Sequence, residues 1–322
     1  MSDTANDARY LEVEDLKVHF GKKGATVHAV DGVSFTVKKG TTFGIVGESG
    51  SGKTTTALAV MRLTHITGGR VSLEGQNVGA LEGEELRQAR RAFQIVFQDP
   101  YSSLNPRQRA ADIIREPLDL MDIGEAGERD GMVRDLLKQV GLRPEQGTLF
   151  PHQFSGGQRQ RIGLARALAT KPSLIVCDEP VSALDVAIQA QILNLMTRLQ
   201  EDLGLTYLFI SHDLGVVQYI CDEIAVMYLG QIVEQADRRT LFTSPKHPYT
   251  KALLAAVPTL HAARGDRSKR QRLSGDPPSP INLPRGCRFA SRCPLVEKQC
   301  HETPPPLRAV SGGHFVACHL AG

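Results

Sequence analysis

The sequence has no long apolar run and no strong excess of charge. No apolar stretch approaches the 18 or more residues that a membrane-spanning helix needs. The polar, acidic start (residues 1–7) lacks the apolar centre of a signal peptide, so we expect a cytosolic protein. Tryptophan is absent, which excludes no function. The formal net charge is +3 over 322 residues, with 41% hydrophobic and 23% charged residues, so composition indicates a soluble globular chain without a charge argument for nucleic acid.

One glycine-rich loop carries the clearest chemistry, reading G-x-x-x-x-G-K-T between an apolar run (43–46) and a helix-like stretch (54–61). Its residues are Gly47, Glu48, Ser49, Gly50, Ser51, Gly52, Lys53 and Thr54, followed by Thr55. Backbone N–H groups of such a loop cradle a polyphosphate, and the helix N-terminus adds favourable partial charge. Lys53 would reach the β- and γ-phosphates, and the Thr54 hydroxyl would ligate Mg²⁺. The loop predicts a binding site for a nucleoside triphosphate.

The rest of the chain predicts an α/β fold. Period-two alternation over 10–39 indicates antiparallel strands, Gly68–Gly69 is expected to close the first helix, and 70–78 suggests a short strand pair. Buried strands are predicted at 93–97, 173–177 and 205–210, a helical insertion at 109–142, and helices after Ser155 and Asp185. Apolar strands that alternate with helices favour a largely parallel sheet with its functional loops at the strand C-termini.

Taken in order, these motifs resemble the ATP-binding cassette of ABC transporters. The motifs are the phosphate loop, Gln98, Ser155-Gly156-Gly157-Gln158, Asp178-Glu179, Ser182-Ala183-Leu184-Asp185 and His212. Segments 97–106, 178–186, 226–230 and 247–250 are similar to the oligopeptide/dipeptide importer branch. Asp-Pro-Tyr at 99–101 resembles what we take as its F-type ATPase subunit, which usually pairs with a D-type subunit. The resemblance covers nearly the whole chain, from Leu11 to His319.

The resemblance implies an ABC-type P-loop NTPase core with an antiparallel β-subdomain, a helical subdomain and a small Cys-rich C-terminal extension. The implied division is core and β-subdomain at 1–98, helical subdomain at 99–168, core at 169–245 and extension at 246–322.

It also implies roles for the motif residues in ATP hydrolysis. Thr54, Gln98 and Asp178 would hold Mg²⁺, while Lys53 would neutralise phosphate charge. Glu179 would act as general base or position the attacking water, and His212 would contact the γ-phosphate. Phe20 is the best candidate for stacking on adenine, with His19 and His28 as competitors. Catalysis would then depend on Glu179, His212, Lys53 and Gln98.

The resemblance further implies that two cassettes act together. Ser155, Gly156, Gly157 and Gln158 would complete the partner's ATP site, with Phe154 where the family usually has Leu. Asp185 would lie at the dimer seam. The expected partners are a second, D-type ATPase subunit, two transmembrane permease subunits that meet Gln98 and residues 101–106, and an extracytoplasmic substrate-binding protein. The chain would act at the cytoplasmic face of the cell membrane, and dipeptides, longer peptides, glutathione and nickel complexes all remain open as cargo.

Four cysteines follow a basic, proline-rich linker (264–284), spaced C-x5-C-x6-C-x17-C: Cys287, Cys293, Cys300 and Cys318. Cytosolic thiols stay reduced, which argues against disulfides. The gaps are wider than typical zinc pairs and do not match generic ferredoxin spacing. Resemblance to peptide-importer ATPases with this tail implies a [4Fe–4S] cluster, with zinc or no metal as alternatives.

A different class of function is also open at this point. Soluble ABC ATPases in DNA repair or translation clamp nucleic acid, and the basic tail could serve as a nucleic-acid module. The single cassette and the short helical insertion favour transport, so we expect no nucleic-acid partner.

Overall fold

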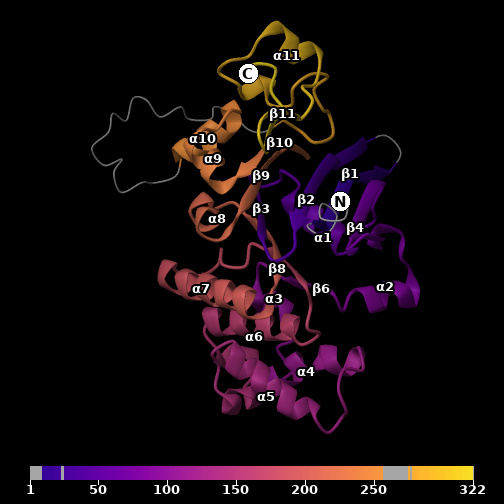
Figure 1. Ribbon diagram of the computed structural model, residues 1–322, viewed down its shortest axis with the longest axis vertical. Coiled ribbons are helices and arrows are strands. Elements are labelled where there is room, and N and C mark those ends of the chain that lie inside the picture. The colour runs from indigo at the N-terminus through magenta and orange to yellow at the C-terminus, as the bar shows by residue number, and fades with distance from the viewer. Residues whose placement is uncertain (1–8, 23–24, 257–274, 276–277, 322) are drawn as a thin grey trace, which may run out of the picture. The chain divides into compact units, whose positions relative to one another are not determined.

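The computed structural model describes residues 9–22, 25–256, 275 and 278–321 (Figure 1). The described chain forms two compact units that alternate along the sequence. The first unit falls within residues 1–10, 37–41 and 73–210, and the second within 11–36, 42–72 and 211–322. These units cut across the four predicted segments, whose boundaries stay a prediction. Residues 1–7 and most of the predicted linker lie outside the described residues.

The antiparallel strands expected near the start are present, mainly in the second unit. They are β1 (Arg9–Lys22), β2 (Ala25–Lys38) and β4 (Gly68–Leu73), adjacent in the order β2-β1-β4. Gly68 and Gly69 open β4, so the prediction that they close the preceding helix is wrong. That helix, α1 (Lys53–Val60), ends at Val60, and a Cβ on Gly69 would lie 2.3 Å from the Asp15 carbonyl oxygen. Gly69 is therefore needed for the close approach to β1 rather than for a helix end.

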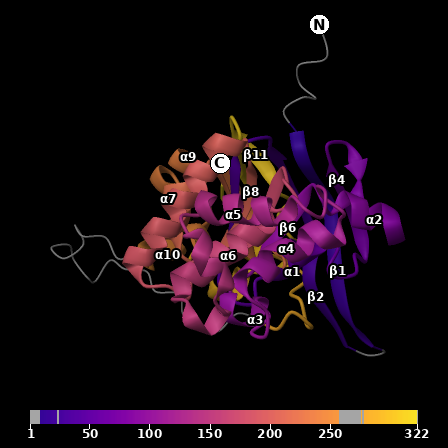
Figure 2. The same ribbon diagram turned by 90° about the horizontal axis from the view of Figure 1, so that it is seen from below.

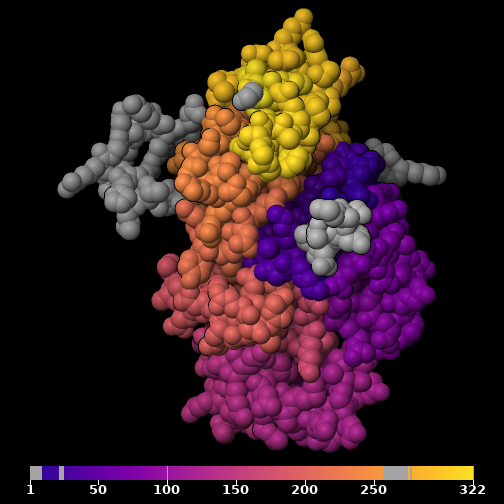
Figure 3. Space-filling view, in the orientation of Figure 1, coloured from indigo at the N-terminus to yellow at the C-terminus, as the bar shows by residue number. Residues whose placement is uncertain are grey.

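A second sheet in this unit combines the phosphate-loop strand with the C-terminal part of the chain. Its strands are β3 (Thr42–Val46), β9 (Glu223–Tyr228), β10 (Gln231–Asp237), β12 (His314–Val316) and β11 (Arg308–Ser311). β3 and β9 are parallel, whereas β9–β10, β10–β12 and β12–β11 are antiparallel. The helices of this unit include α8 (Leu214–Ile220), α9 (Arg238–Thr243), α10 (Pro248–Ala256) and α11 (Lys298–Glu302). The Cys-rich segment therefore adds strands to this sheet, and its surface is the yellow cluster of Figure 3.

The first unit holds parallel strands and the helical insertion. β6 (Phe93–Val96), β7 (Leu174–Asp178) and β8 (Thr206–Ser211) lie side by side and are parallel, as the sequence predicted. Its other elements are β5 (Gln76–Asn77), α2 (Gly83–Ala89), α3 (Pro100–Ser103), α4 (Ala110–Leu120), α5 (Arg129–Gln139), α6 (Gly156–Leu168) and α7 (Val186–Leu203). Figures 1 and 2 show α4 and α5 packed beside α6, which confirms the helical insertion. None of the helices in the described part of the chain is long and apolar enough to cross a bilayer.

A buried ionic cluster fastens the C-terminal segments to β10. The side chain of Glu234 is fully buried, and its carboxylate accepts hydrogen bonds from the backbone N–H groups of Lys246 (2.7 Å) and His247 (2.9 Å). It also contacts His314 Nε2 at 2.7 Å. Because an uncompensated buried charge is costly, these partners together make the burial of Glu234 possible. The cluster joins β10, β12 and the start of α10.

His247 lies beside this cluster and makes stability depend on pH. The residue is 1% exposed, and its Nδ1 accepts a hydrogen bond from the Tyr249 N–H at 3.0 Å, which requires the neutral ring. Burial, together with a smaller effect of nearby Lys251, lowers the pKa of His247 to about 3. An unfolded histidine protonates below about pH 6.5, so between that pH and 3 the unfolded chain binds the extra proton.

We therefore expect His247 to reduce stability as the pH falls from about 6.5, by up to about 1.4 kcal/mol per pH unit. In His247→Asn the amide oxygen replaces Nδ1 as acceptor and does not titrate. Urea unfolding at pH 7 and pH 5 should give a smaller acid loss in this variant than in the wild type. Parallel pH profiles would show that His247 does not titrate in this way.

Candidate nucleotide site

The phosphate loop has the predicted strand–loop–helix setting, between β3 and α1. Its glycines are required by close contacts with neighbouring backbone. A Cβ on Gly47 would lie 2.2 Å from the Met227 carbonyl oxygen, and one on Gly52 would lie 2.2 Å from that of Ala29. Gly50 adopts φ +76° and Gly52 φ +104°, which other residues rarely adopt. The conformation of the loop is thus fixed by its contacts with the neighbouring strands β2 and β9.

The interior of the loop is polar and mostly buried. Lys53 is 5% exposed, and its Nζ donates to the carbonyl oxygens of Gly47 (2.8 Å) and Glu48 (2.9 Å). The Ser51 hydroxyl is buried and has no hydrogen-bond partner. Thr54 is exposed on the first turn of α1, and Thr55 is half-buried. A cation and an unsatisfied hydroxyl inside a glycine loop suit an anionic ligand.

Three of the other predicted residues lie in the first unit, at the ends of parallel strands. Gln98 follows β6, Asp178 ends β7 and is 5% exposed, and Glu179 comes next. Gln98 Nε2 donates to Glu179 Oε2 at 2.9 Å, so the structure brings these two side chains together. Glu179 has φ +48°, a left-handed conformation that is uncommon outside glycine and occurs often at functional sites.

His212 is exposed and follows β8 directly, before Asp213, which caps α8. It belongs to the second unit together with the phosphate loop, whereas Gln98, Asp178 and Glu179 belong to the first. The convergence of the two sets on one nucleotide stays a prediction.

The signature residues have clear local roles at the start of α6. The Ser155 hydroxyl accepts from the Gln158 N–H (3.3 Å), and the Gln158 side chain accepts from the Ser155 N–H (2.9 Å), which is a capping box. A Cβ on Gly156 would lie 3.1 Å from Leu184 Cδ2, and one on Gly157 would lie 2.4 Å from Ile188 Cγ2. The signature glycines therefore pack against the beginning of α7.

Asp185 is the N-cap residue of α7. Its Oδ1 accepts from the Ile188 N–H at 3.0 Å, and its side chain is exposed. The action of Ser155–Gln158 and Asp185 on a second cassette stays a prediction.

Two residues that the sequence did not single out support the phosphate loop. Arg292 forms a two-pronged ion pair with Glu48, with Nη1–Oε2 at 2.7 Å and Nη2–Oε1 at 3.0 Å, and its side chain is 5% exposed. The Tyr249 hydroxyl accepts from the Glu48 N–H at 2.9 Å. Segment 247–250 entered the sequence analysis only through the resemblance, and no local pattern indicates that Tyr249 or Arg292 reaches the loop.

The candidate adenine residue and its two competitors differ in their surroundings. Phe20 is 45% exposed. His19 and His28 instead contact each other and Asp31, with ring centroids 4.3 Å apart. Of the three, Phe20 is the most exposed, since the side chains of His19 and His28 are 25% and 29% exposed.

The four C-terminal cysteines are free thiols, and the other three lie close enough to Cys287 to act on it electrostatically. The Cys287 N–H donates to the Cys300 carbonyl oxygen at 2.8 Å. Burial, together with smaller effects of Cys300, Cys293 and Cys318, raises the pKa of Cys287 to about 11. Within the described residues, no three of these sulfur atoms lie within 4.8 Å of one another. Tetrahedral zinc with Zn–S bonds of about 2.3 Å would need sulfur atoms about 3.8 Å apart, so these side chains would have to move closer together to bind one zinc ion.

Comparison with known proteins agrees with the fold and the loop. The chain matches the ABC transporter model over residues 30–182, and the model for the oligopeptide/dipeptide transporter C-terminal region over 233–300. The oligopeptide transport ATP-binding protein AppF of Bacillus subtilis (strain 168) is 49% identical over 324 residues, with 98% of both chains covered. YkfD of the same strain is 50% identical over 313 residues, covering 96% of this chain and 95% of that protein.

Solved structures support the same assignment. The ATP-binding cassette MJ0796, solved as a dimer bound to ADP and Pi, is 28% identical with a TM-score of 0.64, covering 71% of this chain and 99% of that one. The structure of cbiO1 from Clostridium perfringens is 25% identical with a TM-score of 0.66, covering 74% and 92%. This chain belongs to the ABC transporter family, in the group of its peptide-transport ATP-binding proteins. The label F-type ATPase subunit is wrong, because the matches define an ABC ATP-binding subunit.

The Arg292–Glu48 pair should stabilise the loop measurably. Arg292→Ala leaves the Glu48 carboxylate without its partner, so we expect the free energy of unfolding to fall by roughly 2–3 kcal/mol. A double-mutant cycle with Glu48→Gln should give a coupling energy of about 1–2 kcal/mol in urea unfolding. Arg285→Ala, at an exposed position of the same segment, is the matched control and should change little. Additive effects of the two substitutions would rule out a stabilising pair.

Proposed function

We propose that this chain hydrolyses ATP and thereby drives the import of peptides through partner membrane subunits. The observation that carries the proposal is the phosphate loop. Gly47 and Gly52 pack closely against two strand carbonyl oxygens, and Lys53 and a Ser51 hydroxyl without a hydrogen-bond partner are buried in the loop. Matches to peptide-transport ATP-binding proteins over nearly the full chain favour import over the nucleic-acid alternative.

In this proposal the polyphosphate lies in the loop and Lys53 turns from the loop carbonyls toward it. Phe20 stacks on the adenine ring. Thr54, Asp178 and Gln98 would hold Mg²⁺, and their hydroxyl, carboxylate and amide oxygens are the donors that this ion prefers. When bound, the ion supplies charge neutralisation on the phosphate oxygens.

Glu179 acts on the attacking water, as general base or by positioning it, and His212 contacts the γ-phosphate. Gln98 supports this assignment, because its amide N–H fixes one oxygen of the Glu179 carboxylate at 2.9 Å. The left-handed backbone of Glu179 sets the direction of the side chain at the end of β7.

Dimer formation completes the proposed mechanism. Ser155, Gly156, Gly157 and Gln158 serve the ATP site of a second subunit, and Asp185 lies at the seam. The dimeric MJ0796 cassette supports this arrangement. A D-type ATPase subunit is the proposed partner in a heterodimer.

The permease subunits are proposed to meet the surface around Tyr101, at the cytoplasmic face of the membrane, with an extracytoplasmic binding protein delivering the peptide. Tyr101 is 62% exposed, and the Arg159 guanidinium lies 4.0 Å from its ring centre. Arg166 Nη1 donates to the Ser103 carbonyl oxygen at 2.6 Å. Both arginines belong to α6, which begins at the signature, so a movement of residues 101–106 would reach Ser155 through one rigid helix.

A [4Fe–4S] cluster is the proposed occupant of the Cys287, Cys293, Cys300 and Cys318 site, with zinc as the alternative. The fit rests on the proximity of the four thiols, since Cys293, Cys300 and Cys318 all act electrostatically on Cys287. Its role would be structural, since ATP hydrolysis requires no electron carrier. Arg288 and Arg292, each next to a cysteine in sequence, would hold the segment against β2 and the phosphate loop.

The substitution Glu179→Gln tests the catalytic assignment. It keeps the shape of the side chain but removes its basicity, so we expect ATP binding to be retained and kcat to fall by about 10²–10³-fold. ATP binding by fluorescence and phosphate release in proteoliposomes with the permease subunits measure the two effects. Glu201→Gln, at an exposed position on α7, is the control. Wild-type turnover in Glu179→Gln would remove this residue from the mechanism.

Iron and sulfide analysis of anaerobically purified protein tests the cluster. We expect about four iron and four sulfide per chain, as a [4Fe–4S] cluster requires. Cys300→Ser should lower both values while Cys177→Ser, at a buried cysteine of the first unit, should not. One zinc per chain with no iron would establish the alternative.

A further inference from the structure

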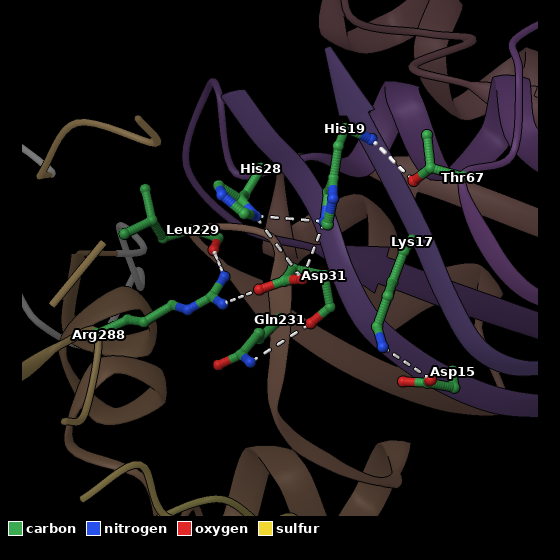
Figure 4. Close-up of polar contacts among 9 residues, drawn as sticks. All are labelled: Asp15, Lys17, His19, His28, Asp31, Thr67, Leu229, Gln231 and Arg288. Atoms are coloured by element: carbon green, nitrogen blue, oxygen red, sulfur yellow. Dashed lines mark hydrogen bonds and ion pairs between the residues drawn. The ribbon is translucent and has the colours of Figure 1, made fainter. Parts of the chain in front are cut away.

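We propose that His19, His28 and Asp31 form a binding site for a divalent transition-metal ion such as Zn²⁺. The three residues come from β1 and β2 of the second unit and point toward one centre (Figure 4). Within the described part of the chain, this is the one group of three such side chains whose ligand atoms all lie within 4.8 Å of one another. The site is separate from the cysteine cluster and from the predicted magnesium ligands.

The spacing of the ligand atoms matches one face of a tetrahedron. His19 Nε2 lies 2.9 Å from Asp31 Oδ1 and 3.3 Å from His28 Nδ1, and His28 Nδ1 lies 3.9 Å from Asp31 Oδ1. The average of these distances is about 3.4 Å. Zn–N and Zn–O bonds of about 2.0–2.1 Å in tetrahedral geometry require edges of about 3.3–3.4 Å. Small side-chain rotations would equalise the three distances without moving the strands.

Protons alone satisfy this arrangement poorly. Suppose that His19 Nε2–H donates to Asp31. An unprotonated His28 Nδ1 then competes with Asp31 for that one proton, whereas a protonated His28 Nδ1 places its N–H against the N–H of His19. When each neutral ring instead carries its proton on its other nitrogen, His19 Nε2, His28 Nδ1 and Asp31 Oδ1 all direct acceptor lone pairs toward one point. A cation at that point would satisfy all three at once.

The carboxylate is held ready by groups on its other side. Burial opposes ionisation of Asp31, but hydrogen bonds from Arg288 and His19 lower its pKa below the ordinary value. Arg288 Nη2 donates to Asp31 Oδ2 and its Nη1 donates to the Leu229 carbonyl oxygen at 2.6 Å, so Oδ1 is left facing the histidines. Such outer partners orient the ligands of metal sites.

The regular alternation of β2 is interrupted next to Asp31. Residues three apart in a regular strand point to opposite faces. Val30 and Val33 are nevertheless both buried, and Gly32 between them has φ +83°. The side chains of His19, His28 and Asp31 are 25%, 29% and 21% exposed, so an ion has access and a fourth position faces solvent.

Donor chemistry selects the class of ion. Two imidazoles and one carboxylate suit Zn²⁺, Ni²⁺ or Cu²⁺ and are a poor set for Mg²⁺ or Ca²⁺, which prefer oxygen ligands. A bound ion would join β1 to β2 and, through Arg288, to the segment that carries Cys287. The Asp31 N–H donates to the Gly230 carbonyl oxygen, and the Gly230 N–H donates to the Ser51 carbonyl oxygen, so the site is two hydrogen bonds from the phosphate loop.

Isothermal titration with Zn²⁺ alone tests the site in the full-length protein. Wild type and His65→Ala, a variant at an exposed histidine of the same unit, should bind one more Zn²⁺ per chain than His19→Ala or His28→Ala. The cysteines are present in all four proteins, so any zinc bound by thiols cancels in the comparison. Equal stoichiometry and affinity in all four proteins would overturn the proposal.

Two further measurements identify the ligands and cover loss of folding in the histidine variants. Cu²⁺-loaded wild type should show nitrogen hyperfine coupling from two imidazoles in its EPR spectrum, and this coupling should be absent if the ion binds elsewhere. Arg288→Lys keeps all three ligands but removes the planar guanidinium group that orients the Asp31 carboxylate. Zn²⁺ should therefore bind about 10-fold more weakly to this variant. Unchanged Zn²⁺ affinity in Arg288→Lys, together with no imidazole coupling, would leave the group as a polar cluster and overturn the proposal.

Discussion

The close approach of two strand carbonyls to the phosphate loop is the constraint on which the second unit depends. The Met227 and Ala29 oxygens lie where a side chain on Gly47 or Gly52 would have to be. The loop is bound further by the β9–β10 turn, because Gly230 donates to the Ser51 carbonyl and accepts from the Asp31 N–H. The two residues of that turn, Leu229 and Gly230, both have positive φ, as a two-residue hairpin turn of this kind requires. The shape of the loop is therefore set by its neighbours as much as by its own glycines.

The C-terminal segments extend this support. The Tyr249 hydroxyl accepts a hydrogen bond from the backbone N–H of Glu48, and Arg292 forms an ion pair with the Glu48 carboxylate. Glu48, the second residue of the phosphate loop, is therefore held by both its main chain and its side chain. Glu234 anchors the same region to β10, through β12 and the start of α10. The Glu234 carboxylate is buried among its partners, and the Glu48 carboxylate is paired with the buried Arg292 side chain, so removal of one partner costs more than the net strength of the pair. The part of the chain beyond β10 thus contacts the phosphate loop and stabilises it.

Local signals in the sequence were sufficient for much of the fold. The phosphate loop, the strands that alternate every two residues and the helix caps at Ser155 and Asp185 depend on short-range chemistry, and they were predicted correctly. Contacts between distant residues could not be predicted in this way. Arg292 and Glu48 are 244 positions apart, and no periodicity connects them. Gly68–Gly69 was misread because a glycine pair indicates a helix end and a close strand approach equally well, and only the position of Asp15 distinguishes the two. The left-handed backbone at Glu179 had no signal, since non-glycine residues rarely adopt it.

The signature segment shows how one set of contacts can serve both stability and recognition. Its capping box, of the kind worth roughly 1 kcal/mol, holds Ser155 and Gln158 in place on their own helix. The contact of Gly157 with Ile188 then fixes the distance between this helix and the start of α7, where Asp185 is exposed. Two exposed helix starts that are rigidly joined lose little conformational entropy when a second surface binds them. Because α6 also holds residues 101–106 through Arg159 and Arg166, the same rigid helix presents one end to a second cassette and its side to a membrane subunit in the proposed assembly. Rigidity of α6 would be required for such a coupling, since a flexible helix would absorb the displacement before it reached the signature.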